Sequence, residues 1–322
     1  MKNFHYYLIV LLFFNISGCN SFHSAPVNNK EDIIKENPEI AALYNSEGEN
    51  HYKSSHYVAA INAFTLSLKY NQHNPVAYNN RGAAHFALGK YAEAITDFTM
   101  AISMDASYAL PLNGRGVIYS EIFDNYSDAL IDFNNAIKID PFYASPYNHR
   151  GVIYTKLEEY NKALLDFNYA IKLNTNYADV YNNRGILYFS LKNFQEAIDD
   201  CNKAISLNPS NAKFYNTRGS IYHDLKMDTA ALEDLNKAIS LVNNNADYYN
   251  NRGTVYYSLK LYENALEDYN LSLKCNPAGS EKLYNDRATL FAILNRYPEA
   301  LDNFYKALER IPGVRKFIIT AV

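Results

Sequence analysis

The amino-acid sequence predicts an all-α protein in which about eight helical hairpins stack one on another. Two observations carry this prediction. The five residues YNNRG occur three times, at 78–82, 181–185 and 249–253, with looser copies between them. The arginine of this stretch recurs every 34 or 35 residues, at Arg81, Arg115, Arg150, Arg184, Arg218, Arg252 and Arg287. A fixed period of this length is typical of proteins built from stacked repeats.

In chain order, the first predicted element is an export signal. Lys2 precedes an apolar run over residues 6–14, about half the ~20 residues that a membrane-spanning helix needs. Such a start is typical of a secretory signal peptide. The run ends in ISGC, residues 16–19, which resembles the bacterial lipoprotein box. The resemblance implies that residues 1–18 are a lipoprotein signal peptide and that Cys19 carries the lipid. The alternative is an ordinary signal peptide in which Cys19 falls at this position by chance.

The same resemblance implies a location. Lipoproteins of this kind tend to stay on the inner membrane when aspartate follows the lipidated cysteine, and here Asn20 follows it. We therefore expect a membrane-anchored lipoprotein of the bacterial cell envelope, on the outer membrane if the cell has two membranes. Residues 21–37 are polar and lack an apolar period, so residues 19–40 are predicted to form a flexible tether.

The hairpins follow from where small and bulky residues recur. We number the places of each repeat so that the glycine of YNNRG is place 8. Place 8 is glycine in seven repeats and Ala288 in the eighth, place 20 is always alanine, and place 27 is alanine or serine. Small residues at these places let two antiparallel helices approach closely, and bulky residues at places 4, 11 and 24 fill the wedge between them. Pro141, Pro209 and Pro277 end the second helix of their repeats.

This pattern resembles the tetratricopeptide repeat, as in RGAAHFALGKYAEAITDFTMAISMD at residues 81–105. The resemblance covers residues 41–314 and implies a right-handed superhelical solenoid of eight repeats. A single repeat cannot bury its apolar face alone, so the end faces of the array need cover. Residues 315–322, RKFIITAV, form an apolar C-terminal tail that is predicted to cover the last repeat. The alternative is an exposed end that pairs with a second copy in a homodimer.

Arginine at place 7 and aspartate at place 23 predict a row of structural ion pairs. The pairs would join Arg81, Arg115, Arg150, Arg184, Arg218 and Arg252 to Asp97, Asp132, Asp166, Asp200, Asp234 and Asp268. Such pairs are commonly bidentate. The sequence leaves open whether they form within one repeat or between two. A catalytic role is disfavoured, because a catalytic site is needed once and these residues recur.

Asparagine occupies place 5 of every repeat, although it is a mediocre helix former. The resemblance implies that places 2, 5, 9 and 12 line a concave groove. We predict that a column of amides binds the backbone of an extended peptide, since each amide offers a donor and an acceptor. The predicted peptide-binding residues are Asn79, Asn113, Asn148, Asn182, Asn216, Asn250 and Asn285, with Phe86, Phe189 and Tyr257 at place 12. The alternative is that the amides bond neighbouring helices and set the spacing of the stack.

Composition and motifs argue against other classes of function. The formal net charge is -4, and no basic cluster offers the contacts that nucleic-acid phosphates need. The three cysteines are far apart, so they indicate neither a disulfide framework nor a metal site, and Cys201 and Cys275 are predicted to be buried thiols. Catalytic and phosphate-binding motifs are absent from the sequence. We therefore expect no enzymatic activity, cofactor, metal or small-molecule substrate.

The sequence thus predicts a non-enzymatic protein–protein interaction scaffold of the cell envelope, whose groove binds an extended segment of a protein partner. By analogy with tetratricopeptide lipoproteins, it would be an assembly factor or an adaptor. The alternative is a structural spacer or oligomerisation scaffold that uses the ends of the solenoid rather than its groove.

Overall fold

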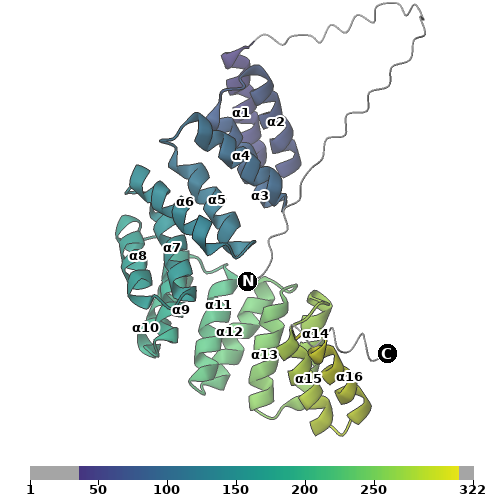
Figure 1. Cartoon of the computed structure of the whole chain (residues 1–322). Helices are drawn as coiled ribbons and strands as arrows, with labels where there is room; N and C mark the ends of the chain where they lie inside the picture. Colours follow the sequence, from purple (N-terminus) through teal and green to yellow (C-terminus); the bar gives the residue numbers. More distant parts are fainter. Residues whose placement is uncertain (1–35, 312–322) are drawn as a thin grey trace, which may run out of the picture.

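The computed structural model describes residues 36–311, and every regular element in that range is an α-helix (Figure 1). The helices are α1 (Pro38–Lys53), α2 (Tyr57–Tyr70), α3 (Pro75–Ala87), α4 (Tyr91–Met104), α5 (Ala109–Glu121), α6 (Tyr126–Ile139), α7 (Ala144–Lys156), α8 (Tyr160–Leu173), α9 (Ala178–Ser190), α10 (Phe194–Leu207), α11 (Ala212–Asp224), α12 (Asp228–Leu241), α13 (Ala246–Ser258), α14 (Tyr262–Cys275), α15 (Glu281–Ile293) and α16 (Tyr297–Leu308). Each odd-numbered helix packs on the even-numbered helix that follows it, so α1 and α2 form hairpin one and α15 and α16 form hairpin eight. The predicted all-α solenoid of eight hairpins is confirmed.

The hairpins stack in chain order into an open arc (Figure 1). Each even-numbered helix packs on the next odd-numbered one. Successive odd-numbered helices from α1 to α13 also touch each other, whereas even-numbered helices in the described range do not meet to this extent. Helices on the inside of a bend lie closer together than those on the outside. The odd-numbered helices therefore line the concave side of the arc.

The solenoid begins three residues earlier than predicted. The side chain of Asn37 caps α1 by accepting a hydrogen bond from the Ile40 amide at 3.1 Å, and Pro38 suits the first helical turn. Residues 38–40, which were assigned to the tether, are therefore helical. The predicted signal peptide, Cys19 and the tail at 315–322 lie outside the described residues. Within residues 36–311, no helix is both long and apolar enough to cross a membrane.

A similar backbone turn joins the two helices of every hairpin, with three residues between the helices except in hairpin three, which has four. One residue of each inner turn has a positive φ: Gly89 in hairpin two, and elsewhere Ser55, Asp124, Glu158, Lys192, Lys226, Lys260 and Asn295. The amide after it donates back to the first helix, as His56 N does to the carbonyl oxygen of His51 at 2.9 Å. This bond satisfies a carbonyl group at the end of the first helix. The recurrence of this turn explains why the hairpins have similar shapes, although the turn of hairpin three is one residue longer.

Glycine at place 8 sets how closely the two helices of a hairpin approach. A Cβ atom on Gly116 would lie 2.7 Å from Cε1 of Phe133, the ring at place 24 of the same hairpin. Rings at place 24 are also confined by the next hairpin, since a Cβ on Gly114 would lie 2.6 Å from Cζ of Phe98 in the hairpin before it. The Phe98 ring is therefore held between two successive hairpins and joins them into one core.

The two cysteines of the described range differ in burial. Cys201 fills the place-24 position of hairpin five and is buried, as predicted, and burial raises the pKa of its thiol to about 12. Cys275 is only half-buried, so the prediction of a second buried thiol is wrong. The reason is its position as the last residue of α14, where the chain leaves the packed hairpin.

The arginine at place 7 forms the predicted ion pair within its own hairpin. Its Nε and Nη2 donate to the two carboxylate oxygens of the aspartate at place 23, at 2.7–2.9 Å. Six such pairs form: Arg81–Asp97, Arg115–Asp132, Arg150–Asp166, Arg184–Asp200, Arg218–Asp234 and Arg252–Asp268. The pairs therefore form within one hairpin and not between two, which the sequence left open.

A third bond of the same arginine, which the sequence analysis missed, leads to the preceding hairpin. Nη1 of Arg150 donates to Asn134 Oδ1 at 2.6 Å, and every arginine at place 7 has an equivalent acceptor at place 25 of the hairpin before it. The acceptors are Thr65, Thr99, Asn134, Asn168, Asn202, Asn236 and Asn270. The recurrence of threonine or asparagine at place 25 is the sequence signal for this bond. We call the complete set of bonds the arginine ladder.

The end hairpins show where the arginine ladder stops. Hairpin one, which has no hairpin before it in the described range, carries Glu47 at place 7. In hairpin eight, Asn303 replaces the aspartate and accepts a single bond from Arg287 Nε at 2.7 Å. Burial without a carboxylate partner lowers the pKa of Arg287, whereas the hydrogen bond to Asp97 raises the pKa of Arg81. The ladder is complete only in hairpins that have a neighbour on both sides.

Adding one methyl group at place 8 should force a hairpin apart. Gly116→Ala places Cβ against the Phe133 ring, a clash that costs about 1–3 kcal/mol, while alanine returns up to about 1 kcal/mol of helix propensity. We expect a net loss of about 1 kcal/mol in the free energy of unfolding, measured by urea denaturation. Phe133→Leu copies Leu235 of hairpin six and makes room for the methyl group. The double variant should therefore lose less than the sum of the two single losses, and additive losses would contradict the proposed contact.

Removing one carboxylate from the arginine ladder should destabilise the solenoid. Asp166→Ala leaves the half-buried guanidinium of Arg150 without its partner, and we expect a loss of about 3–5 kcal/mol in urea denaturation followed by circular dichroism. Asp166→Asn, which copies hairpin eight, keeps one acceptor and should lose less. The control is Glu233→Ala on an exposed helix face, which should change stability by at most about 0.5 kcal/mol. A loss from Asp166→Ala no larger than that of the control would rule out the ladder as a stabilising feature.

Candidate functional site

The asparagines at place 5 lie mostly between hairpins rather than in the groove. Four are buried: Asn79, Asn113, Asn148 and Asn182. Three are half-buried, Asn45, Asn216 and Asn250, and Asn285 in the last hairpin is exposed. Asn148 and Asn182 are only 2% and 0% exposed, so a peptide in the groove does not reach them. The prediction of a continuous peptide-binding column of amides is therefore wrong for the four buried residues.

Bonds between hairpins explain part of this burial. Asn183 Nδ2 donates to Asn148 Oδ1 at 2.9 Å, and Asn251 Nδ2 donates to Asn216 Oδ1 at 2.8 Å. In both bonds, place 6 of one hairpin meets place 5 of the hairpin before it. At these two junctions the amides order the stack, which is the alternative that the sequence also allowed.

Three tyrosines cover the middle of the groove. Tyr108, Tyr143 and Tyr177 stand directly before α5, α7 and α9, where Asn74, Asn211 and Asn245 cap α3, α11 and α13. Burial raises the pKa of all three phenols. The phenol of Tyr143 lies near those of Tyr108 and Tyr177, and that of Tyr108 also lies near Glu49 at place 9 of hairpin one. Tyrosine side chains therefore form a row along the central part of the concave side.

The predicted aromatic residues at place 12 line the edge of the groove. The rings of Phe86, Phe189 and Tyr257 each pack on an aromatic ring at place 17 of the same hairpin, with ring centroids 5.9, 6.0 and 5.9 Å apart. Phe86 and Phe189 are half-buried, and Tyr257 is partly exposed. The pairing fixes one side of each ring and leaves the remaining surface available to a ligand.

Two hollows open in the concave side, one near each end. The first, of about 230 Å³, lies between α1 and α3 and is lined by Glu49, Tyr52, Lys53, Phe64, Val76, Asn80 and Ala83. The second, of about 220 Å³, lies between α13 and α15 and is lined by Thr254, Tyr257, Tyr269, Lys282, Asp286 and Thr289. Both are formed by places 9, 12 and 24 of one hairpin and places 2, 6 and 9 of the next. They are therefore equivalent positions of the repeat, which we call the first and the last pocket.

An extra residue in the chain explains the last pocket. The turn after Pro277 is one residue longer than in the other repeats, contains Gly279 at φ 55°, and ends at Ser280, whose hydroxyl caps α15 by accepting from Leu283 N at 3.0 Å. α15 does not pack against α13 as closely as the earlier odd-numbered helices pack against one another. The longer turn thus leaves a gap between the last two hairpins on the concave side.

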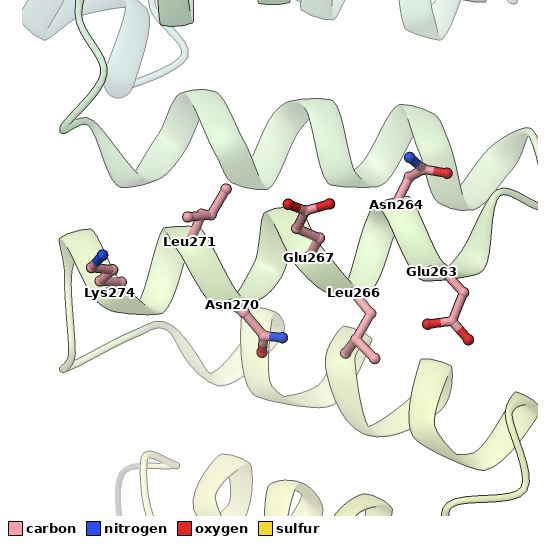
Figure 2. A pocket seen from close by; sticks show the side chains of 7 residues that line it. All are labelled: Glu263, Asn264, Leu266, Glu267, Asn270, Leu271 and Lys274. Atoms are coloured by element: carbon pink, nitrogen blue, oxygen red, sulfur yellow. The ribbon is translucent and has the colours of Figure 1, made fainter.

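A larger hollow of about 500 Å³ lies along α14, away from the two pockets. Figure 2 shows that its seven labelled side chains, from Glu263 to Lys274, all come from this one helix and diverge from it. One of them, Asn270, is an acceptor of the arginine ladder. The hollow lacks converging polar groups and is a surface trough rather than a binding site.

Two histidines of the described range are held by packing or by a hydrogen bond within the solenoid. His149 stacks on the ring of Phe133 with centroids 5.7 Å apart, and burial, with the nearby charge of Lys213, lowers its pKa to about 4. His223 Nδ1 lies 2.8 Å from Asp228 Oδ1, at the places where other hairpins have their aromatic pair. In residues 36–311, no group of three or more histidine, cysteine, aspartate or glutamate side chains could hold a metal ion.

Comparisons with protein families agree with this architecture. The family profile described as "Tetratricopeptide repeat" matches residues 75–108, 178–211 and 246–278. A second profile, described as "TPR repeat", matches residues 151–192 and 219–260. Among curated proteins, none matches the sequence significantly.

Several solved structures share the fold. A tetratricopeptide repeat protein from Parabacteroides merdae is 21% identical, with a TM-score of 0.59, and the match covers 82% of this chain and 99% of that one. The Cut9–Hcn1 hetero-tetramer of the APC/C matches at 16% identity and a TM-score of 0.70, over 87% of this chain and 55% of that one. PilF from Pseudomonas aeruginosa matches at 19% identity and a TM-score of 0.55, over 67% and 98%. At these identities the likeness concerns the fold.

Proposed function

Because the chain belongs to the tetratricopeptide repeat family, we propose that it is a non-enzymatic scaffold whose concave groove binds an extended segment of a protein partner. Members of this family generally mediate protein–protein interactions. The observation that supports groove binding most directly is the pair of pockets at equivalent positions of the repeat. Each is smaller than the roughly 300–1,000 Å³ typical of sites for whole small molecules, and each suits one side chain of a bound polypeptide.

The groove of this proposal differs from the one that the sequence predicted. Its ligand-facing groups are the aromatic rings at place 12, the row of central tyrosines and the two pockets, together with Asn285, which is exposed. Aromatic side chains offer large contact areas at low entropic cost and are frequent at energetically dominant contacts. The buried asparagines support the stack from behind this surface.

We further propose that the scaffold is a lipoprotein of the bacterial cell envelope, anchored through Cys19 and serving as an assembly factor or adaptor. The support is the ISGC stretch at residues 16–19 after a short apolar run. Asn20 favours the outer membrane if the cell has two. The lipid would hold the solenoid at the membrane, while its groove stays open to a partner.

A second candidate function is a scaffold that uses the end of the solenoid. The last helix, α16, exposes a row of apolar side chains where a further hairpin would pack, including Leu301 at 58% and Tyr305 at 56% exposure. Leu308 continues the same row. Such a face suits self-association of two copies through their C-terminal ends.

One experiment distinguishes the groove from the end. In the groove variant, Phe86→Ala and Phe189→Ala remove two rings at place 12, and in the end variant, Leu301→Ala and Tyr305→Ala remove apolar surface of α16. A photo-crosslinking residue replaces Tyr257 in the groove, with Leu165 on an exposed convex position as the background control. Crosslinked partners from envelope extracts are quantified by mass spectrometry, and folding is checked by circular dichroism.

Groove binding predicts that the groove variant loses roughly tenfold or more of the crosslinked partner, because two truncated aromatic anchors cost more than about 1.4 kcal/mol. The end variant should capture as much partner as the wild type. The end scaffold predicts the opposite: a dimer of the wild type in light scattering that only the end variant abolishes. Equal capture by the wild type and a folded groove variant would reject groove binding.

Lipid attachment has a direct test. Metabolic labelling with an alkyne-bearing fatty acid should label the wild type and not Cys19→Ser, and the variant should move from the membrane to the soluble fraction. Cys275→Ser is the matched control, because it removes a half-buried cysteine of the solenoid and should leave labelling unchanged. An unlabelled wild type, or labelling that survives Cys19→Ser, would refute the anchor.

A further inference from the structure

The first and last pockets share a chemical feature that the other junctions lack. Places 6 and 9 supply wall residues to both pockets, and the array has seven junctions between hairpins. Only the first and the last junction carry a carboxylate at these places: Glu49 at place 9 and Asp286 at place 6. The five junctions between them have neutral residues there, apart from His149, although two of these junctions carry an aspartate at place 2, Asp179 and Asp247.

Each of these carboxylates faces aromatic rings. In the first pocket the rings are Tyr52 and Phe64, and in the last pocket they are Tyr257 and Tyr269. Phe64 and Tyr269, at place 24, are almost fully buried and form the floor, whereas the place-12 tyrosines are partly exposed. A carboxylate beside aromatic rings is the combination that attracts a cation, which interacts favourably with ring faces as well as with the opposite charge.

The carboxylate of Asp286 lacks a strong partner of its own. Among the described residues no side chain or backbone group within hydrogen-bond distance donates to it. The nearest cation, Lys282 Nζ, is 3.9 Å away and belongs to a side chain that is 72% exposed, while the Asp286 side chain is only 28% exposed. An ion pair with so exposed a lysine contributes little, and desolvation raises the pKa of Asp286. A bound cation would supply the interaction that this carboxylate lacks.

The carboxylate of Glu49 is held in place by hydrogen bonds to only one of its two oxygens. Its Oε1 accepts hydrogen bonds from Asn45 Nδ2 at 2.8 Å and from Asn80 Nδ2 at 3.3 Å. These amides come from the two helices that border the first pocket, so they fix the orientation of the carboxylate across the junction. Oε2 has no donor among the described residues and remains available to a ligand.

From this geometry we infer that each of the two pockets binds a basic side chain, lysine or arginine, of the polypeptide segment in the groove. The inference rests on the proposed function, because it names the chemistry of the segment that the groove binds. Each pocket has room for one side chain, one carboxylate to pair with its charge, and aromatic rings to contact its stem and its head. Each pocket is also lined by one lysine, Lys53 or Lys282, whose side chain is exposed to solvent. The net charge of -4 also favours the approach of a basic segment.

The test compares two peptide probes that differ in charge and not in shape. One is a fluorescein-labelled peptide of repeated Gly-Ser-Arg units, and the other carries citrulline, the neutral isostere of arginine, at every arginine. Binding to the full mature chain is measured by fluorescence anisotropy at constant ionic strength. The pocket variant is Glu49→Gln with Asp286→Asn, and the charge-matched control is Glu233→Gln with Glu263→Gln on exposed positions outside the groove.

We expect the wild type and the control to bind the arginine peptide roughly tenfold more tightly than the citrulline peptide, a difference of about 1.4 kcal/mol. In the pocket variant this ratio should fall to about one, with a circular dichroism spectrum and melting temperature like those of the control. An unchanged ratio in the pocket variant, or an equal fall in the control, would overturn the inference, as would no preference for arginine in the wild type.

Failure of this inference is distinguishable from failure of the groove. If both peptides bind the wild type equally and both lose affinity in the Phe86→Ala and Phe189→Ala variant, the groove binds polypeptide without a basic anchor, and the inference is wrong. If neither peptide binds, the inference is also wrong, and the crosslinking experiment decides the groove by itself. Chemical-shift changes confined to residues of the two pockets, on titration with N-acetyl-arginine-methylamide, would support it independently.

Discussion

One guanidinium group in each inner hairpin holds three helices together: the two helices of its own hairpin and the second helix of the hairpin before it. In a solenoid, each unit contacts only its neighbours, so the shape of the whole depends on how every junction is fixed. The arginine ladder fixes each junction with charge-assisted bonds of defined geometry, and the ring at place 24 fills the space beside them. Because burying a charge is costly, we interpret the ladder mainly as a device that sets the register of the stack, since a shifted hairpin would leave a guanidinium without its partners.

The regular junctions create a groove that is not uniform along its length. At three central junctions a tyrosine stands before the first helix, and at three others an asparagine does. The asparagine caps the helix, which is worth about 0.5–2 kcal/mol, whereas the tyrosine gives up this bond and covers part of the concave side. The middle of the groove is therefore a tyrosine-lined surface, and the carboxylate-bearing pockets lie at its two ends.

The sequence predicted the ladder better than the groove, for a physical reason. Arg150 and Asp166 are sixteen residues apart within one hairpin, so the short-range geometry of two antiparallel helices brings them together. Asn148 and Asn182 lie on the correct helices, but helical periodicity gives only the direction of a side chain. Whether the side chain reaches solvent depends on how closely the next hairpin approaches, as the bond from Asn183 to Asn148 shows. The pockets depend on the same distance and were not predicted.

By itself, the sequence determined the number of hairpins, the close contact at place 8 and the pairing of arginine with aspartate. These features are encoded within one period of 34 residues, where helix geometry links residue spacing directly to contact. Only the tertiary structure decided which amides are buried, where tyrosines cover the groove and where pockets open. Those properties depend on the separation of successive hairpins, which is set by packing across each junction and, at the last one, by a single extra residue in the turn after Pro277.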